Sequence, residues 1–386
     1  MKSKTLLLIV IILLLTGCYD HKELNKIAIL TATEINKNND EFIINAEVVN
    51  PQSPDKTTYI QAPFIIYTGK GKTISEAYRQ IKLSSSRYLY PDHLSILIIN
   101  EKIAKEDITE IFDFYLRNPS VRTEFNVLIG KNEDILSLTT PIDKLSSSSI
   151  LESIKTNNQY QGITNLVTLD DMSIMYLNPH KEIILPSIKI ENDNKDSDNI
   201  KNTEDTKIDS TYKLSNLAVF KGNKLQGYLT NDESITYNLI TNNVKNSIIT
   251  YECENNKYLT AEIITSSSKI KPKNNEINID INISTVINES NCNIELNNAK
   301  TIKQLEKDLS SYLKEKTEKN INNIRKKYNS DIFGFLDEIY KHDYKTYQKV
   351  KNNWYNQEFK NIKININSQI NIIGKGNIME GNNEKN

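Results

Sequence analysis

The sequence predicts an α+β fold, with a small mixed sheet and helices in the N-terminal half and a largely antiparallel sheet with a long helix in the C-terminal half. From residue 27 to residue 190, strand-like and helix-like segments alternate, which is typical of a sheet with helices packed on it. After residue 212, the strand-like segments alternate apolar and polar side chains, so each buries one face only. A polar interval at 191–211 lies between the two regions.

Three extended segments come first in the folded part of the chain. Ile27–Glu34 and Glu41–Asn50 are predicted strands, because apolar side chains recur at every second position of the latter. Tyr59–Tyr67 is a further extended segment, which we expect Gly69 and Gly71 to end.

A capping box marks the first helix of this half. In Thr73-Ile74-Ser75-Glu76, the threonine hydroxyl can accept from the Glu76 amide while the glutamate side chain reaches back. Apolar residues at 74, 77, 78 and 81 then share one face. The other predicted elements are strands at 93–100, 123–129 and 182–190 and helices at 106–116, 147–155 and 169–177.

The interval 191–211 differs from its surroundings in composition. Its 21 residues include seven acidic and three basic side chains, and only Ile200 and Ile208 are apolar. Such a segment cannot bury enough surface to fold alone, so we expect an inter-domain linker or a long exposed loop. It would separate an N-terminal region at 18–190, of one or two subdomains, from a C-terminal α+β domain at 212–375 and a polar tail at 376–386.

The C-terminal region is predicted to open with a hairpin. Strands at 214–220 and 225–229 flank the turn Lys221-Gly222-Asn223. A second capping box, from Thr230 to Glu233, starts a helix that reaches about residue 242. Strands follow at 247–254, 258–270 and 276–287, the last with isoleucine at every second position from 277 to 283.

The longest helix is predicted from a third capping box, Thr301-Ile302-Lys303-Gln304, to about Tyr328. Its apolar stripe favours packing on the sheet. The alternative is a basic helix on a membrane surface, although Glu306 and Asp308 dilute its positive charge. Helices at 331–340 and 344–355 and a strand at 362–372 complete the domain.

The N-terminus has the order of a signal peptide. Lys2 and Lys4 precede the apolar run Leu6–Leu15, which as a helix reaches ~15 Å, about half of a bilayer core. Leu15-Thr16-Gly17-Cys18 resembles the lipobox of bacterial lipoproteins. The resemblance implies removal of residues 1–17 and a Cys18 that carries a diacylglycerol thioether and an N-acyl chain such as palmitate. The alternative is a plain secretory signal with a cysteine near the cut.

Charge and the remaining cysteines restrict the partners and the compartment. The net charge of −1 becomes −3 without Lys2 and Lys4, so nothing in it recruits nucleic acid. We expect Cys253 and Cys292 within strands and outside the cytoplasm, where they either form a disulfide or remain two separate buried thiols.

No set of residues in the sequence predicts catalysis, a cofactor or a metal. The histidines are dispersed without ligand spacing: His21, His93, His180 and His342. Gly71-Lys72-Thr73 ends like a P-loop, but Ile66 stands where its first glycine belongs. We expect Asp337 and Glu338 on a solvated helix face rather than in acid–base chemistry, and Trp354 in the core.

Several segments together resemble the Ger(x)C family of spore germination lipoproteins, in order along nearly the whole mature chain. The first is Gly17-Cys18-Tyr19-Asp20-His21-Lys22-Glu23-Leu24-Asn25-Lys26-Ile27-Ala28. The others are Gly71–Ala77, His93 before its strand, Tyr115-Leu116-Arg117-Asn118-Pro119, Phe220–Leu225, Asp331–Ile339, Asn353-Trp354 and the closing strand. The family usually has Trp at the place of Tyr19, and a Pro-x-x-Trp step where this chain reads His342-Asp343-Tyr344-Lys345-Thr346-Tyr347.

This resemblance implies the C subunit of a nutrient germinant receptor. Such a subunit has no enzyme activity and is held by its lipid at the outer face of the spore inner membrane. Its implied partners are the membrane-embedded A and B subunits of the receptor and the bilayer itself, reached through Cys18.

Two other protein classes would share the anchor. An extracytoplasmic solute-binding lipoprotein would have two doubly wound lobes around a polar cleft, which the one-face strands after residue 212 disfavour. A lipid-anchored hydrolase would need a nucleophile, a base or a metal set that the sequence does not contain.

Overall fold

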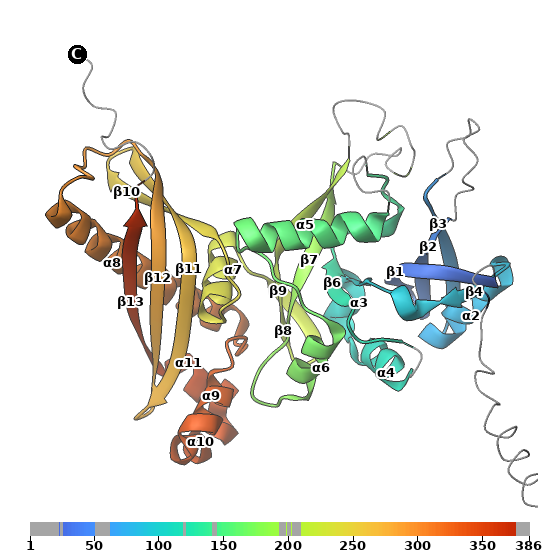
Figure 1. The fold of residues 1–386 in the computed structure, drawn as a ribbon. Coiled ribbons are helices and arrows are strands. Elements are labelled where there is room, and N and C mark those ends of the chain that lie inside the picture. Colours follow the sequence, from blue (N-terminus) through green and yellow to red (C-terminus); the bar gives the residue numbers. More distant parts are fainter. Residues whose placement is uncertain are drawn as a thin grey trace, which may run out of the picture.

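The computed structural model describes residues 26–50, 62–118, 121–140, 145–192 and 210–375, together with positions 23, 198 and 202. The predicted signal peptide, Cys18, the loop after Asn50 and the polar tail lie outside these residues. Within them the chain forms two sheets, of nine and four strands. Figure 1 shows the nine-stranded sheet across the middle and right of the molecule and the four-stranded sheet at its left end.

The nine-stranded sheet is mixed, as predicted, but it is larger than expected. Its order is β3-β2-β1-β5-β6-β7-β8-β9, and β4 pairs in parallel with β1. The strands are β1 (Ile27–Asn38), β2 (Glu41–Val49), β3 (Phe64–Gly71), β4 (Tyr88–Tyr90), β5 (Ile96–Asn100), β6 (Asn126–Gly130), β7 (Ile184–Glu191), β8 (Thr211–Lys221) and β9 (Lys224–Tyr228). The chain from β1 through β5 and β6 to β7 pairs in parallel, and the outer pairs on both sides are antiparallel.

The interval 191–211 joins neighbouring strands of this one sheet. Glu191 on β7 lies opposite Thr211 on β8 in an antiparallel register. Asn202, one of its described residues, is buried and donates to the carbonyls of Thr139 and Ser210. Of the two expectations, a linker between domains or a long loop, the pairing fits a loop between neighbouring strands, because the hairpin β8–β9 extends the N-terminal sheet.

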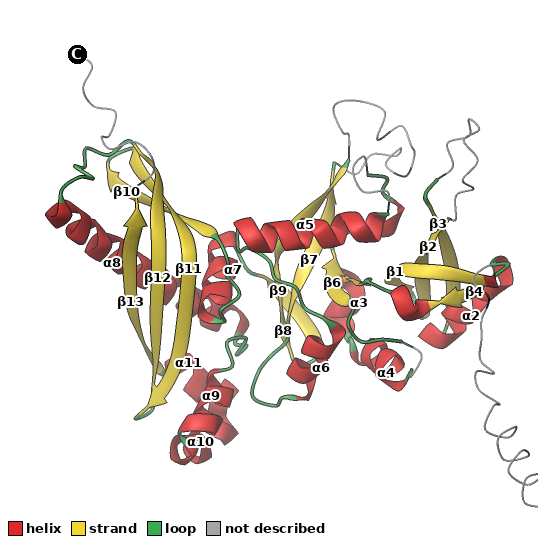
Figure 2. Ribbon diagram, viewed as in Figure 1, coloured by secondary structure: helices red, strands yellow, loops and turns green. Residues whose placement is uncertain are grey.

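Helices cover the nine-stranded sheet largely where the sequence places them (Figure 2). They are α2 (Ile74–Ser84), α3 (Glu101–Glu106), α4 (Thr109–Arg117), α5 (Ser146–Tyr160) and α6 (Leu169–Leu177). The single helix predicted at 106–116 is in fact two, because the chain is extended at Asp107, whose side chain accepts from the Thr109 amide. The strand predicted from His93 starts at Ile96, since Pro91–His93 form a short 3-10 turn.

The second sheet is largely antiparallel, as predicted. Strands β10 (Ser247–Glu254), β11 (Lys257–Lys273) and β12 (Glu276–Ser290) are antiparallel, and β13 (Lys363–Gly374) joins β12 in parallel. The isoleucines of β12 at 277 to 283 are at most 1 % exposed. They share a core with Leu305, Leu309 and Ile324 of the long helix α8 (Ala299–Tyr328). The apolar stripe of α8 thus lies inside the protein, and the membrane-surface alternative for this helix is wrong.

Two of the three predicted capping boxes start their helices as expected. The Thr73 hydroxyl accepts from the Glu76 amide, and Thr230 and Glu233 form a complete box before α7 (Asn231–Ile240). The third is wrong, because α8 begins one turn earlier with Asn298 as its cap. After α8 come α9 (Phe335–His342), α10 (Tyr344–Val350) and α11 (Phe359–Asn361).

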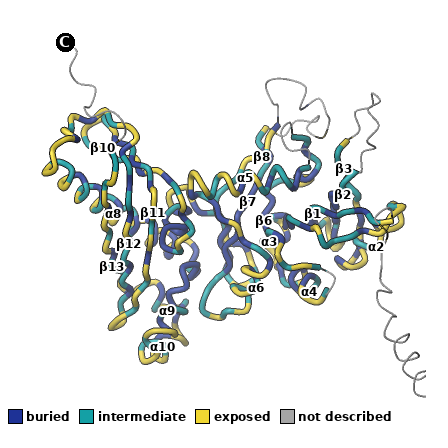
Figure 3. The backbone as a smooth tube through the Cα atoms, viewed as in Figure 1, coloured by how far each residue is buried: buried dark blue, intermediate teal, exposed yellow. Residues whose placement is uncertain are grey.

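One core extends from the first sheet into the second. Ile184 of β7 and Leu217 and Val219 of β8 belong to the same buried cluster as the strands β11 and β12. Figure 3 shows this buried interior as a dark band through the molecule. No helix in the described part of the chain is long and apolar enough to cross a bilayer.

Gly69 and Gly71 lie inside β3 rather than after it, which corrects the sequence expectation. A side chain at Gly69 would overlap the Ala77 carbonyl oxygen and lie 2.7 Å from Cγ1 of Ile81, both on α2. At Gly71 it would lie 2.6 Å from the Ala77 amide. The two glycines therefore let α2 pack directly on the strand.

We predict that Gly69→Ala lowers the free energy of unfolding by about 3 kcal/mol, because the helix backbone cannot move without leaving the sheet. Urea-induced unfolding followed by circular dichroism measures this. Lys70→Ala, one position along on the exposed side of the strand, is the matched control and should change stability by less than about 0.5 kcal/mol. Equal effects of the two changes would contradict the close packing.

Candidate functional site

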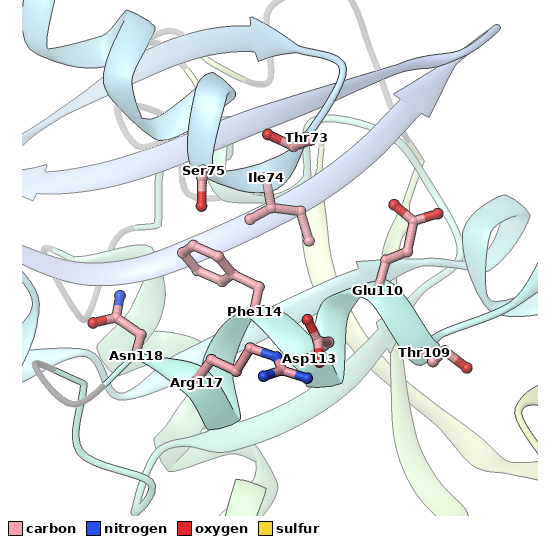
Figure 4. Close-up of a pocket in the computed structure, with 9 residues that line it drawn as sticks. All are labelled: Thr73, Ile74, Ser75, Thr109, Glu110, Asp113, Phe114, Arg117 and Asn118. Atoms are coloured by element: carbon pink, nitrogen blue, oxygen red, sulfur yellow. Dashed lines mark hydrogen bonds and ion pairs between the residues drawn. The ribbon is translucent and has the colours of Figure 1, made fainter.

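Segments that are far apart in the sequence meet around α4. At its start, Asn223 of the β8–β9 turn donates to the Thr109 hydroxyl (2.7 Å), and the Ile108 amide donates to the Asn223 carbonyl (3.1 Å). At its side, α4 faces the first turn of α2 (Figure 4). Three of the segments that carry the family resemblance, 71–77, 115–118 and 220–225, therefore lie together.

A groove separates the start of α2 from α4. Its volume is ≈ 580 Å³. Ile74 and Ser75 on one side face Phe114 on the other, as Figure 4 shows. Its lining residues are Thr73, Ile74, Ser75, Thr109, Glu110, Asp113, Phe114, Arg117 and Asn118.

The groove has an apolar floor and a charged rim. Ile74 is buried and Phe114 is half-buried, whereas Glu110, Asp113 and Arg117 are exposed. The Arg117 Nε donates to Asp113 Oδ1 (2.6 Å), one helical turn apart. Because this pair is in solvent, it contributes little stability, and both charges stay accessible to a partner.

Phe114 is held in place by a buried tyrosine pair. Its ring stacks on Tyr78, with centroids 5.4 Å apart and an interplanar angle of 13°. The Tyr78 hydroxyl lies 2.9 Å from Thr33 Oγ1 and 3.0 Å from the Tyr115 hydroxyl. Burial raises the pKa of both tyrosines, so they remain neutral hydrogen-bonding groups. The floor of the groove is therefore preorganised by the β-sheet behind it.

The groove is lined by apolar, hydroxyl, amide and charged side chains. It contains neither histidine nor cysteine, and the part of the chain that is described holds no cluster of ligands for a metal ion. The Lys72 amide donates to Glu76 Oε2 (2.8 Å), so the P-loop-like Gly71-Lys72-Thr73 caps a helix. An apolar floor with a charged rim fits the side chains of a partner polypeptide.

A second cluster forms where α8 ends. The carboxylate of Asp331 is fully buried and accepts from the amides of Phe335 (3.0 Å) and Leu336 (2.9 Å) and from the Trp354 indole (3.2 Å). Burial raises its pKa to about 6, although these three hydrogen bonds oppose the rise. Trp354 is 2 % exposed, which confirms that it fills the core.

His180 and Asp337 come together, although the sequence gives no sign of it. His180 Nδ1 lies 3.8 Å from Asp337 Oδ1, and its Nε2 lies 3.0 Å from the Tyr347 hydroxyl. Asp337 is also paired with Lys341 at 2.6 Å, so it is more enclosed than the solvated helix face we expected. Both imidazole nitrogens face these neighbours, and the cluster joins β7 to α9 and α10. His342 is exposed beside Glu338, His93 is exposed, and His21 lies outside the described residues.

Two buried glutamates were missed in the sequence, where they look like ordinary strand residues. Glu47 accepts from the Thr31 hydroxyl (2.6 Å) and from the amide and hydroxyl of Ser147 at the start of α5. Glu34 accepts from the Leu136 amide (3.4 Å), and burial raises its pKa to about 7. No periodicity could have marked them, because their partners lie about 100 residues away in the chain.

Two of the three predicted cysteine sites lie within the described residues. Cys253 on β10 and Cys292 after β12 form a disulfide, with Cα atoms 6.3 Å apart. It ties an edge strand to the segment that leads into α8. Cys18, the predicted lipid site, lies outside the described residues.

Comparisons with known proteins agree along the whole chain. Residues 20–190 match the family described as spore germination protein N-terminal domain, and residues 215–376 match the family described as spore germination B3/GerAC like, C-terminal. Spore germination protein KC of Bacillus subtilis is 26% identical over 96% of this chain and 95% of its own length. Spore germination protein B3 of the same organism is 21% identical over 91% of this chain and 92% of its own. The crystal structure of the GerBC protein superposes with a TM-score of 0.52 at 17% identity, covering 88% of this chain and 96% of that one, so the two share a fold.

The raised pKa of Asp331 makes a prediction about pH. The folded state holds this proton more tightly than the unfolded state, whose aspartates titrate near ~3.9. Its stabilising effect is therefore complete below about pH 4 and is lost as the pH rises through the folded pKa of about 6. Asp331→Asn should lower stability at every pH, because an amide nitrogen placed at Oδ2 can accept from neither Leu336 nor Trp354. It should also reduce the fall in unfolding free energy between pH 4 and pH 6.

Urea unfolding at half-unit pH steps measures the effect. Glu34 keeps its own dependence in the variant, so the slope should shrink without vanishing. Asp40→Asn, at an exposed turn, is the control and should leave the slope unchanged. An unchanged slope in Asp331→Asn would show that this carboxyl is not the group that titrates.

Proposed function

The chain belongs to the Ger(x)C family of spore germination proteins, and from that premise we propose that it is the lipoprotein C subunit of a nutrient germinant receptor. In this proposal Cys18 carries the lipid, residues 1–17 are removed, and the body lies at the extracytoplasmic face of the spore inner membrane. It supports germination by contacts with the membrane-embedded A and B subunits and catalyses no reaction.

The observation that carries the proposal is the convergence of family-like segments on one groove. Segment 115–118 includes Leu116, which is 46% exposed, and the exposed Arg117. Burial explains neither residue. A surface formed by segments 71–77 and 115–118, positioned by Asn223 of the third segment and backed by a fixed aromatic floor, supports a docking site for a partner subunit.

The two other protein classes gain no support from the fold. A solute-binding lipoprotein requires two doubly wound lobes, whereas the second sheet here is largely antiparallel. A hydrolase requires a nucleophile activated by a base, and the groove contains neither histidine nor cysteine to serve in such a pair.

We predict that Arg117→Glu impairs germination, because it reverses the charge on the rim of the proposed docking groove. Spores that carry the variant as their only copy should respond to the nutrient germinant at least tenfold more slowly, with unchanged protein level by immunoblot. Lys273→Glu, at the far end of β11, is the matched control and should germinate normally. Normal germination of Arg117→Glu spores would exclude the groove as a contact.

The anchor gives a separate prediction. Cys18→Ala removes the thiol that would be acylated, so the protein should move from the membrane pellet to the soluble fraction and germination should be impaired. Tyr19→Trp, which installs the residue usual in the family next to the same cysteine, should stay in the pellet. A Cys18→Ala protein that remains in the pellet would show that partner contacts, and not the lipid, hold it.

A further inference from the structure

We propose that the C-terminal end of α2 and the adjoining strand β4 form the surface that rests on anionic lipid headgroups. This surface consists of Arg79, Lys82, Leu83, Arg87 and Tyr88, and we call it the basic edge. The proposal rests on the Cys18 anchor of the preceding section and adds an orientation to it.

The length of the tether limits which part of the protein can touch the bilayer. Lys26 is the eighth residue after Cys18, and even a fully extended chain of eight residues spans at most ~28 Å. β1 begins at Ile27, which pairs directly with Tyr88 of β4. The basic edge therefore starts at the point where the tether meets the folded body. The four-stranded sheet lies at the opposite end of the molecule (Figure 1).

The composition of the basic edge is that of a membrane interface. All five residues are exposed, and residues 79–90 contain three basic side chains and no acidic one. Leu83 is 81% exposed, more than any other large apolar side chain in the described part of the chain, and Tyr88 is 40% exposed. Lys82 Nζ lies 5.1 Å from the centre of the Tyr88 ring. Exposed leucine and tyrosine surrounded by cations are typical of surfaces that enter the headgroup region.

The packing of α2 on the sheet does not require the exposed residues of the basic edge. The buried face of α2 is complete with Ile74, Ala77 and Ile81, and Leu83 points away from it. Glu76 caps the other end of the helix, and Asp92 accepts from the Tyr90 hydroxyl (2.6 Å). Among the described residues, no carboxylate forms an ion pair with Arg79, Lys82 or Arg87. The positive charge of the edge is thus not neutralised by its surroundings.

The net charge of the protein makes a local basic surface necessary for close contact. The mature chain carries −3, so an anionic membrane repels it as a whole. Basic side chains close to such a surface are attracted to it. Three of them next to the tether orient the body with this edge toward the lipid.

The test uses the full lipidated protein in vesicles of phosphatidylglycerol and phosphatidylcholine that include a nitroxide-headgroup lipid. A fluorophore is attached at Leu83→Cys or, as the matched control, at Lys273→Cys at the far sheet. We expect quenching at position 83 to exceed quenching at position 273 at least fivefold. We also expect it to fall to the control level in 1 M salt, where the Debye length is ~3 Å.

A charge reversal separates lipid contact from mere proximity. Lys82→Glu/Arg87→Glu should abolish the excess quenching at position 83 on phosphatidylglycerol vesicles. Lys345→Glu/Lys349→Glu, an equal change on α10, should leave it intact.

The outcomes distinguish this proposal from the anchor on which it rests. Protein that does not sediment with the vesicles would overturn the anchor and the orientation together. Protein that sediments while its position-83 label is unquenched would overturn only the orientation. Quenching that appears only after the partner subunits are added to the vesicles would also overturn it, because the edge would then be a protein contact.

Discussion

The buried carboxylate of Asp331 is the interaction on which the joining of the two halves depends. The carboxylate fixes the first turn of α9 and the Trp354 indole, while the backbone carbonyl of Asp331 accepts from the Glu182 amide just before β7 (3.1 Å). The adjacent Ser330 hydroxyl donates to the Phe220 carbonyl of β8 (2.6 Å). Two segments of the nine-stranded sheet and two from the helical region after α8 thus meet at Asp331 and Ser330. A charged group is costly to bury, so the site is stable only while all of these donors are in place.

The contacts of Asp331 and Ser330 also link the core to the proposed docking groove. Glu182, whose amide meets Asp331, accepts through its carboxylate from the Gly222 amide (2.7 Å). The next residue, Asn223, holds the first turn of α4. The groove in the N-terminal half is therefore positioned in part by the end of the long C-terminal helix. A substitution of Asp331 can therefore alter the geometry of the groove without contacting any residue that lines it.

Local sequence patterns predicted most elements, and long-range pairing accounts for most of the errors. Isoleucine alternation identified β12, and the capping boxes at Thr73 and Thr230 identified α2 and α7. The addition of β8 and β9 to the first sheet could not be predicted, because a strand carries no mark of the partner it will pair with. The candidate site likewise depends on long-range contacts that local sequence patterns do not reveal. The ordered family-like segments indicated what kind of protein this is, but only folding shows that 71–77 and 220–225 meet at α4.

Helix α2 carries the groove at its first turn and the basic edge at its last. It has 11 residues and is therefore ~16 Å long. If its last turn touches the headgroups, the groove stands no more than this distance above them, whatever the tilt of the helix. A partner that fills it needs only a short loop or a helix end projecting from the bilayer. The helix would then act as a spacer that selects partners by how far they rise from the membrane.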